Sequence, residues 1–243
     1  MSDGGFYDSS KNIITWNKKN NSNLEELRPG DTGKLAFSFT VHAGKGEPQV
    51  KVDLSAKGQR VSESNVEEEI NSSISKIVKL TSDLHLASQA LYFTGPLENS
   101  GPIPPKAEQE TTYTIVWTVT NTTNAISNAK VTATLPSYVS WNNVISPTSE
   151  KITFDQVTGN LVWDVGNVPS DTGFSKPKRE VAFQVGFKPS VTQVGSSPVI
   201  LSTQKLTGHD NYADAEIGDE RNSLTTRLTG DTGFSSDDEK VLP

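Results

Sequence analysis

The sequence predicts an all-β protein made of two immunoglobulin-like Greek-key β-sandwich domains in tandem, the first of which can be incomplete. Three observations predict this fold class. The hydrophobic content is only 33%, which suits thin sheets joined by many polar turns. Short runs alternate apolar and polar residues with the period of a half-buried strand. A long segment also occurs twice, and repeats of this kind indicate repeated domains.

The repeat is clearest at Phe154–Trp163 (FDQVTGNLVW), which lies 147 residues after Tyr7–Trp16 (YDSSKNIITW). Both copies place an aromatic residue, an aspartate, a polar turn, an aliphatic residue and a tryptophan at matching positions. Two further pairs of segments keep nearly the same spacing: Leu35–Phe39 with Val181–Val185, and Lys79–Asp83 with Arg227–Asp231. Three blocks that stay in step indicate that the chain carries two copies of one domain.

Two pairs of matching residues in the repeat have predicted roles. We expect Asp8 and Asp155 to accept backbone N–H bonds in the turn that follows the aromatic residue, as aspartates in turns do. Trp16 and Trp163 are interpreted as core residues, in preference to platforms for sugar binding.

The first copy offers strands separated by polar turns. The strand candidates are Asn12–Trp16, Lys34–Val41, Gln49–Ala56, Ser73–Leu80 and Asp83–Thr94. Asp83–Thr94 is interpreted as the strand that closes the first domain. Ala43–Pro48 is a Gly-rich turn, and the acidic Glu63–Ser73 could be a surface loop or a short helix. A loop is favoured because the matching acidic segment, Asp210–Arg221, contains glycine.

The second copy offers about seven strands and no convincing helix. Its clearest strand alternates apolar residues with threonines, and Trp117 on that strand is the candidate core aromatic. A loop that begins at Pro136 includes Trp141. The strand candidates are Glu110–Asn121, Ala129–Leu135, Ile152–Phe154, Asn160–Asp164, Glu180–Phe187, Pro198–Leu206 and Ser223–Leu228.

These strands predict three segments. Residues 1–94 form a partial or short immunoglobulin-like sandwich, and residues 110–243 form a complete one with an acidic tail. Residues 95–109 form a linker or an edge strand, because prolines exclude helix and central strand there. The four prolines are Pro96, Pro102, Pro104 and Pro105.

The position at which the repeat begins indicates that the first domain lacks strands. In the second copy about three strands precede the aromatic–Asp motif, and the first copy lacks them. Three explanations stay open. The chain belongs to a longer repeat protein, the first domain is a shorter variant that closes on itself, or another chain donates the missing strands.

Composition excludes several classes of function. The net charge of -7 and a pI near 5.0 disfavour nucleic acid as a partner. The absence of cysteine excludes disulfides, thiolate metal sites and cysteine nucleophiles. No apolar run reaches the ~20 residues of a membrane span, and the N-terminus lacks the regions of a signal peptide. No catalytic serine or dinucleotide motif occurs, so we expect no enzyme.

Two sets of residues are candidates for binding. Clustered acidic residues near the C-terminus could hold calcium, which prefers oxygen ligands, although the spacing is not that of an EF-hand and a solvated acidic loop explains it too; they are Asp210, Asp214, Glu216 and Asp219. Calcium is the only cofactor considered. Tyr138 and Trp141 could form an aromatic surface for a glycan or a protein.

A resemblance adds to these predictions. Gly101–Lys106 (GPIPPK), Glu110–Asn121 (ETTYTIVWTVTN) and Trp163–Gly166 (WDVG) resemble segments of the "conserved repeat domain" found in tandem in bacterial cell-wall and cell-surface proteins. The resemblance covers residues 95–230 well and 7–93 in part. It implies an extracellular, non-enzymatic module of a longer chain, and it carries over no catalytic residue.

The predicted function is therefore a cell-surface structural module that acts as a stalk, spacer or adhesion element. Its expected partners are neighbouring repeats or copies of itself. One alternative is a module that binds a glycan or another surface protein through exposed aromatics. Another is a subunit of an assembly completed by strand donation. Exposed Trp and Tyr side chains would favour binding, whereas buried ones would favour the spacer.

Overall fold

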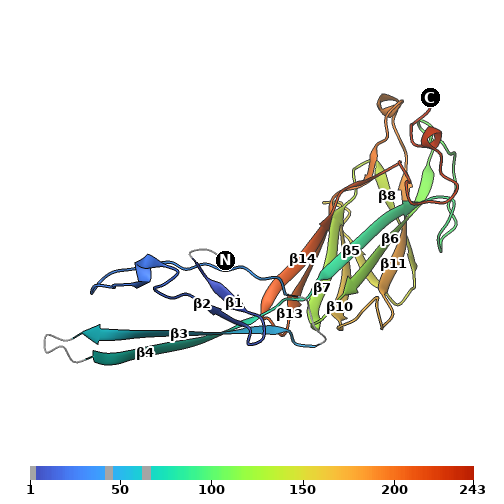
Figure 1. Cartoon of the computed structure of the whole chain (residues 1–243). Helices are drawn as coiled ribbons and strands as arrows, with labels where there is room; N and C mark the ends of the chain where they lie inside the picture. Colours follow the sequence, from blue (N-terminus) through green and yellow to red (C-terminus); the bar gives the residue numbers. More distant parts are fainter. Residues whose placement is uncertain (1–3, 42–45, 62–66) are drawn as a thin grey trace. The chain divides into compact units, whose positions relative to one another are not determined.

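The computed structural model describes residues 4–41, 46–61 and 67–243 (Figure 1). It confirms the all-β fold class, since the described residues contain strands and three short 3₁₀ turns but no α-helix. No helix in these ranges is long and apolar enough to cross a membrane. The chain divides into two compact units, residues 1–43 and 44–243. Part of the predicted Ala43–Pro48 turn and the start of Glu63–Ser73 lie outside the described residues.

The N-terminal unit contains one small hairpin. Strands β1 (Phe6–Asp8) and β2 (Ile13–Thr15) pair antiparallel, with Tyr7 opposite Ile14, and a 3₁₀ turn, η1 (Ser22–Leu24), follows. The predicted strand Lys34–Val41 is wrong in this structure, because residues 31–41 include no strand. An alternating pattern makes a strand only beside another strand.

The second copy of the repeat forms the same hairpin. Strands β9 (Lys151–Phe154) and β10 (Asn160–Val168) pair with Phe154 opposite Leu161, the positions that match Tyr7 and Ile14. The turns match as well, because Asn12 (φ 55°) and its counterpart Gly159 (φ 73°) both adopt the left-handed conformation that favours Asn and Gly. The repeat read from the sequence is therefore structural at this hairpin.

The two aspartates of these turns behave as predicted. Asp8 Oδ1 accepts the hydroxyl and the backbone N–H of Ser10, and Asp155 Oδ1 accepts the N–H of Val157 at 2.8 Å. These hydrogen bonds stabilise the carboxylate form, so the pKa of each aspartate lies below its ordinary value.

The C-terminal unit contains a sandwich of two sheets and a separate long hairpin. The four-stranded sheet has the order β5 (Leu84–Leu91), β6 (Thr111–Asn121), β11 (Arg179–Phe187), β8 (Val139–Ser146). The five-stranded sheet has the order β14 (Ala215–Arg221), β13 (Gln204–Asp210), β7 (Ile126–Thr134), β10, β9. The remaining elements are the hairpin β3 (Gln49–Val61) and β4 (Glu67–Lys79), the pair β12 (Val199–Leu201) and β15 (Leu224–Thr225), and the 3₁₀ turns η2 (Val191–Gln193) and η3 (Ser236–Asp238).

The core of the sandwich lies between the two sheets. Trp117 on β6 stacks on Trp163 of β10 with ring centroids 6.4 Å apart, and Phe183 of β11 meets Trp117 edge-on at 4.8 Å. All three side chains are fully buried. The predictions that Trp117 and Trp163 are core residues are confirmed. Their burial explains why the inward positions of β6, β10 and β11 are apolar.

The expected segment boundaries differ from the observed ones. Strand β5, expected to close the first domain, pairs with β6 over its whole length and contributes Leu84 and Leu86 to the sandwich core. Residues 95–109 cover the outer side of the β6 start: the Thr112 N–H donates to Ser100 O (2.8 Å) and Thr111 Oγ1 donates to Pro102 O. The prolines cannot donate backbone hydrogen bonds to a strand ladder. The segment therefore forms no regular strand, although it packs against the sandwich.

Three stretches expected to be loops contain strands. Residues 210–221 turn back on β13 as strand β14, with Gly218 opposite Thr207, and the described part of Glu63–Ser73 belongs to β4. The loop expected around Trp141 is strand β8, which pairs with β11. In each case backbone pairing with a neighbouring strand outweighs the weak strand propensity of polar and acidic residues.

We predict that Phe183→Ala lowers the free energy of unfolding of the sandwich by about 3–5 kcal/mol, because it removes a buried ring that contacts Trp117. Urea denaturation followed by tryptophan fluorescence measures the change. Val144→Ala is the control, since Val144 is exposed on β8. Equal stability of the two variants would contradict this core.

Candidate functional site

The most distinctive polar feature of the sandwich is a set of three carboxylates that fix β5 along its length. Asp210, Asp219 and Asp231, called here the three carboxylates, all come from the C-terminal part of the chain. Each accepts backbone N–H groups from β5 or the residues beside it. Strand β5 therefore has two supports, a ladder with β6 on one edge and these side chains on the other.

Asp210 holds the segment that precedes β5. Its Oδ2 accepts the Ser82 N–H at 2.7 Å and the Asn124 side-chain amide at 2.9 Å. Its Oδ1 accepts the N–H groups of Tyr212 and Ala213. The carboxylate is fully buried at the end of β13. Because all its contacts are protein hydrogen bonds, Asp210 joins three segments at the point where the chain enters the sandwich.

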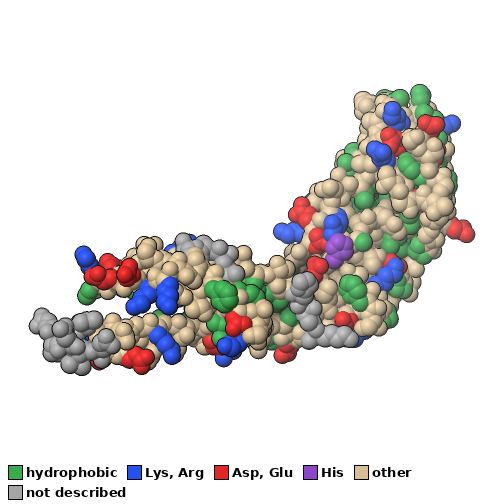
Figure 2. Space-filling model, in the orientation of Figure 1, with side chains coloured by type: hydrophobic (Ala, Val, Ile, Leu, Met, Phe, Trp, Pro, Cys, Tyr) green, Lys and Arg blue, Asp and Glu red, His purple; other side chains and the backbone are tan. Residues whose placement is uncertain are grey.

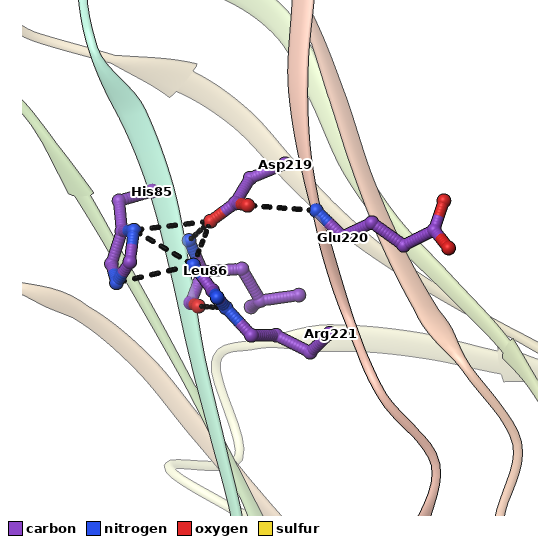
Figure 3. Close-up of polar contacts among 5 residues, drawn as sticks. All are labelled: His85, Leu86, Asp219, Glu220 and Arg221. Atoms are coloured by element: carbon purple, nitrogen blue, oxygen red, sulfur yellow. Dashed lines mark hydrogen bonds and ion pairs between the residues drawn. The ribbon is translucent and has the colours of Figure 1, made fainter.

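Asp219 holds β5 near its start, at Leu86 (Figure 3). The Leu86 N–H donates to Asp219 Oδ2 at 2.9 Å, and Arg221 Nε donates to the Leu86 carbonyl. Arg221 also contacts Asp219 Oδ2 and His85 Nδ1 through Nη2. Side chains from β14 thus satisfy both backbone groups of Leu86, on the edge of β5 that does not pair with β6. Covering an edge in this way prevents it from pairing with another chain.

Asp231 holds the end of β5. Its Oδ2 accepts the N–H groups of Tyr92 (2.6 Å) and Phe93 (2.8 Å), and its Oδ1 accepts the N–H and the hydroxyl of Thr94. The side chain is buried. This one carboxylate fixes the turn through which β5 leaves the sheet.

Burial and hydrogen bonding act in opposite directions on two of these carboxylates. Desolvation raises the pKa of Asp210 and Asp219, but the hydrogen bonds they accept, and for Asp219 the Arg221 charge, outweigh it. The pKa of each therefore lies below the ordinary aspartate value. The ionised carboxylate is the form that stabilises the fold.

The structure does not bring the four predicted calcium ligands together. Asp210 and Asp219 accept the protein N–H groups described above, whereas Asp214 and Glu216 lie 3.3 Å and 3.1 Å from the two ring nitrogens of His209. The described residues contain no group of three or more acidic, His or Cys side chains placed to hold one metal ion. Two of the predicted ligands thus have another role, as hydrogen-bond acceptors for the β5 segment.

The two predicted binding aromatics are half-buried. Tyr138 packs edge-on against Phe187 (5.9 Å), and Trp141 lies on Phe183 (5.4 Å) and Phe154 (6.0 Å). Both pack against the core cluster. By the criterion set above, this packing favours a structural role for them, and glycan or protein binding through these rings stays a prediction.

An open cleft on the sandwich shows no catalytic arrangement. Arg179 donates to Glu150 Oε2 at 3.0 Å, the same oxygen accepts Trp163 Nε1 at 2.8 Å, and Lys178 pairs with Glu180. The charged side chains that line it are thus paired with each other. Figure 2 shows acidic and basic side chains interspersed over the visible face of the sandwich. The contacts among these groups support protein structure.

The sequence offered little sign of these contacts. Asp231 ends the third repeated block, but its counterpart Asp83 is exposed, so the repeat predicts a turn there and not a buried acceptor. Ser82 lies in the same repeated block and Arg221 ends the acidic segment, but neither pattern predicts a contact with a carboxylate or with β5. Only the pairing of β13 with β14 places Arg221 beside Leu86, and that pairing was not predicted.

We predict that stability is constant near neutral pH and decreases below about pH 4. The reason is that Asp210 and Asp219 have folded-state pKa values below the unfolded value, so their contribution is complete above the unfolded pKa and is lost as the pH falls through the folded one. Asp219→Asn should be less stable than the parent at pH 7 and should lose less on acidification. Urea titrations at a series of pH values measure both effects. Asp164→Asn, an exposed change on β10, is the control, and the same acid dependence in Asp219→Asn and the parent would contradict the assignment.

Comparisons with known proteins give structural likeness only. No protein-family model and no curated protein matches the chain. Among solved structures, BcpA, the major pilin subunit of Bacillus cereus, is 12% identical with a TM-score of 0.35, and a BcpA variant has a TM-score of 0.38. In both cases the match covers 70% of this chain and 47% of the pilin, so the chain spans about half the length of these subunits. The full-length major pilin SpaD from Corynebacterium diphtheriae is 15% identical with a TM-score of 0.35, over 59% of this chain and 35% of SpaD.

Proposed function

We propose that this chain is a non-enzymatic structural module of an extracellular surface protein, a spacer whose sandwich resists tension along its strands. The observation that carries the proposal is the fixing of β5 by Asp210, Asp219 and Asp231 in addition to its ladder with β6. The resemblance of Glu110–Asn121 to a surface repeat supports the extracellular location.

The path of the chain through the sandwich fits a spacer. The chain enters next to Ser82, which bonds to Asp210. The last residues dock at the opposite end of the sandwich (Figure 1), where the Leu242 N–H donates to Pro105 O and the Val241 N–H donates to Ser196 O. A pull between these two points therefore runs along the strands. It loads the β5–β6 hydrogen bonds together instead of one after another.

The three carboxylates would add resistance at the strand that receives this load. Asp210 acts before β5, Asp219 acts near its start and Asp231 acts just after its end. The strand therefore cannot slide past β6 without breaking contacts at all three places. Hydrogen bonds to charged groups contribute about 1.5–3 kcal/mol each. The trait that selection would favour here is a slow unfolding rate, since forced unfolding depends on that rate.

We predict that Asp231→Ala lowers the force at which the sandwich unfolds. The experiment is single-molecule force spectroscopy on the full chain, pulled through attachments at Leu80 and at the C-terminus. Loss of the carboxylate leaves the N–H groups of Tyr92 and Phe93 without their acceptor, and the unfolding rate at a fixed force should rise about tenfold or more.

Asp164→Ala is the matched control, because it removes an exposed carboxylate from the neighbouring sheet. Its unfolding force should equal that of the parent. The spacer function is contradicted when the parent unfolds at forces too small to resolve, or when Asp231→Ala unfolds at the parent's force despite a lower stability in urea.

A further inference from the structure

The long hairpin β3–β4 is amphipathic over most of its length. The register pairs Val50 with Val78, Leu54 with Ile74 and Gly58 with Ile70. Directly opposed and alternate residues share one face of an antiparallel pair. One face, called here the apolar face, therefore carries Val50, Val52, Leu54, Ala56, Ile70, Ile74 and Val78. The same face also carries Gly58, Ser72 and Lys76, and at its far end Arg60 lies opposite Glu68. The other face carries mainly polar residues.

The apolar face is largely exposed. The exposed fractions are 51% for Leu54, 49% for Ile70 and 66% for Ile74. A two-stranded ribbon is marginally stable alone in water and needs further strands or another element packed over its apolar side. Exposed apolar surface of this kind marks an interaction site.

The polar face is the one that contacts the sandwich at the base of the hairpin. Lys79 Nζ donates to the Tyr212 carbonyl at 2.7 Å, and its ammonium group lies 4.8 Å from the centre of the Tyr212 ring. The Tyr212 hydroxyl donates to Gln49 Oε1 at 3.0 Å. Gln49 and Lys79 oppose each other on the polar face. The sandwich thus fixes the ribbon through its polar side and does not cover the apolar one.

We propose that the apolar face packs against the same face of a second copy of this chain, with the two hairpins antiparallel about a two-fold axis near Ser72. The pattern on β4 complements itself under that symmetry. Ile70 and Ile74 each lie two residues from Ser72. Ile70 of one copy therefore packs on Ile74 of the other copy, and Ile74 packs on Ile70. Glu68 and Lys76 lie four residues from Ser72 on either side. Glu68 of each copy therefore meets Lys76 of the other copy, which gives two ion pairs.

The residues at the centre allow close approach. Ala56 opposes Ser72 across the ribbon, and both side chains are small. Two sheets that pack face to face lie about 10 Å apart, and the larger Leu54, Ile70 and Ile74 fill the layer on either side of the axis. A parallel arrangement would instead lay β4 over β3 of the second copy, with Glu68 over Arg60 and Lys76 over Val52, so only the antiparallel arrangement gives both Glu68 and Lys76 a charged partner.

The area of the face sets the strength of the association. Thirteen residues per strand give a ribbon ~44 Å long and ~10 Å wide. This corresponds to roughly 900 Å² buried over both copies, which is below the ~1,200 Å² of stable interfaces and in the range of weak, transient ones. The dimer is therefore weak and dissociates in the micromolar-to-millimolar range. Copies held side by side on a surface would associate through a higher effective concentration.

The test is sedimentation equilibrium of the full chain over a wide concentration range. The parent should show a monomer–dimer equilibrium, and Ile74→Lys should raise the dissociation constant by about tenfold or more, because it places a charge in the interface. Ile77→Lys is the matched control. It alters the same residue type on the same strand, but on the polar face, and it should leave the equilibrium unchanged.

A charge exchange tests the antiparallel register. Arg60 lies opposite Glu68 within the hairpin, so the double variant, which keeps any effect of Glu68→Lys on the hairpin itself, isolates the contact between copies. Glu68→Lys and Lys76→Glu should each weaken the dimer, and the double variant should restore it. A parent that stays monomeric at millimolar concentration would overturn the proposal and indicate that another part of the same chain covers the face. Equal effects of Ile74→Lys and Ile77→Lys, or no rescue in the double variant, would overturn it too. The force measurement concerns carboxylates of the sandwich, so either proposal can fail without the other.

Discussion

The structure of the C-terminal unit depends on backbone N–H groups of the β5 segment that donate to carboxylates. Strand β5 has a ladder partner on one edge only, and Asp210, Asp219 and Asp231 supply acceptors on the other. A buried N–H without an acceptor costs about 1–3 kcal/mol. These contacts therefore stabilise β5 in the sandwich in addition to its ladder with β6 and its buried Leu84 and Leu86.

The same contacts connect local sequence to mechanics. Arg221 balances the Asp219 charge and occupies the Leu86 carbonyl, so the edge of β5 is covered as well as fixed. A sheet edge that is covered by side chains resists pairing with foreign strands. The long hairpin is different, because its apolar face has no such cover from the sandwich. One molecule thus combines a protected domain with a ribbon that is suited to association.

The sequence predicted what depends on local pattern, and failed where distant pairing decides. The alternation of Glu110–Asn121 and the repeated aromatic–Asp turn predicted β6 and the β9–β10 hairpin, because both follow from side-chain period and turn chemistry. The acidic run after Asp210 predicted a loop or a calcium site, yet it is strand β14, since β13 offers it a ladder. Lys34–Val41 has a strand pattern but forms no strand, which shows that alternation alone is insufficient. The role of Asp231 required knowing that residues 92–94 and 231 meet.

Whether the three carboxylates fix β5 is measured most directly by amide hydrogen exchange, followed by NMR, at Ser82, Leu86, Tyr92 and Phe93. These N–H groups bond to carboxylates and not to a neighbouring strand. We predict protection comparable to that of the β5–β6 ladder, with Leu86 alone losing protection in Asp219→Asn. Exchange of these amides as fast as that of exposed loops would show that the carboxylates do not fix β5, and would contradict the account.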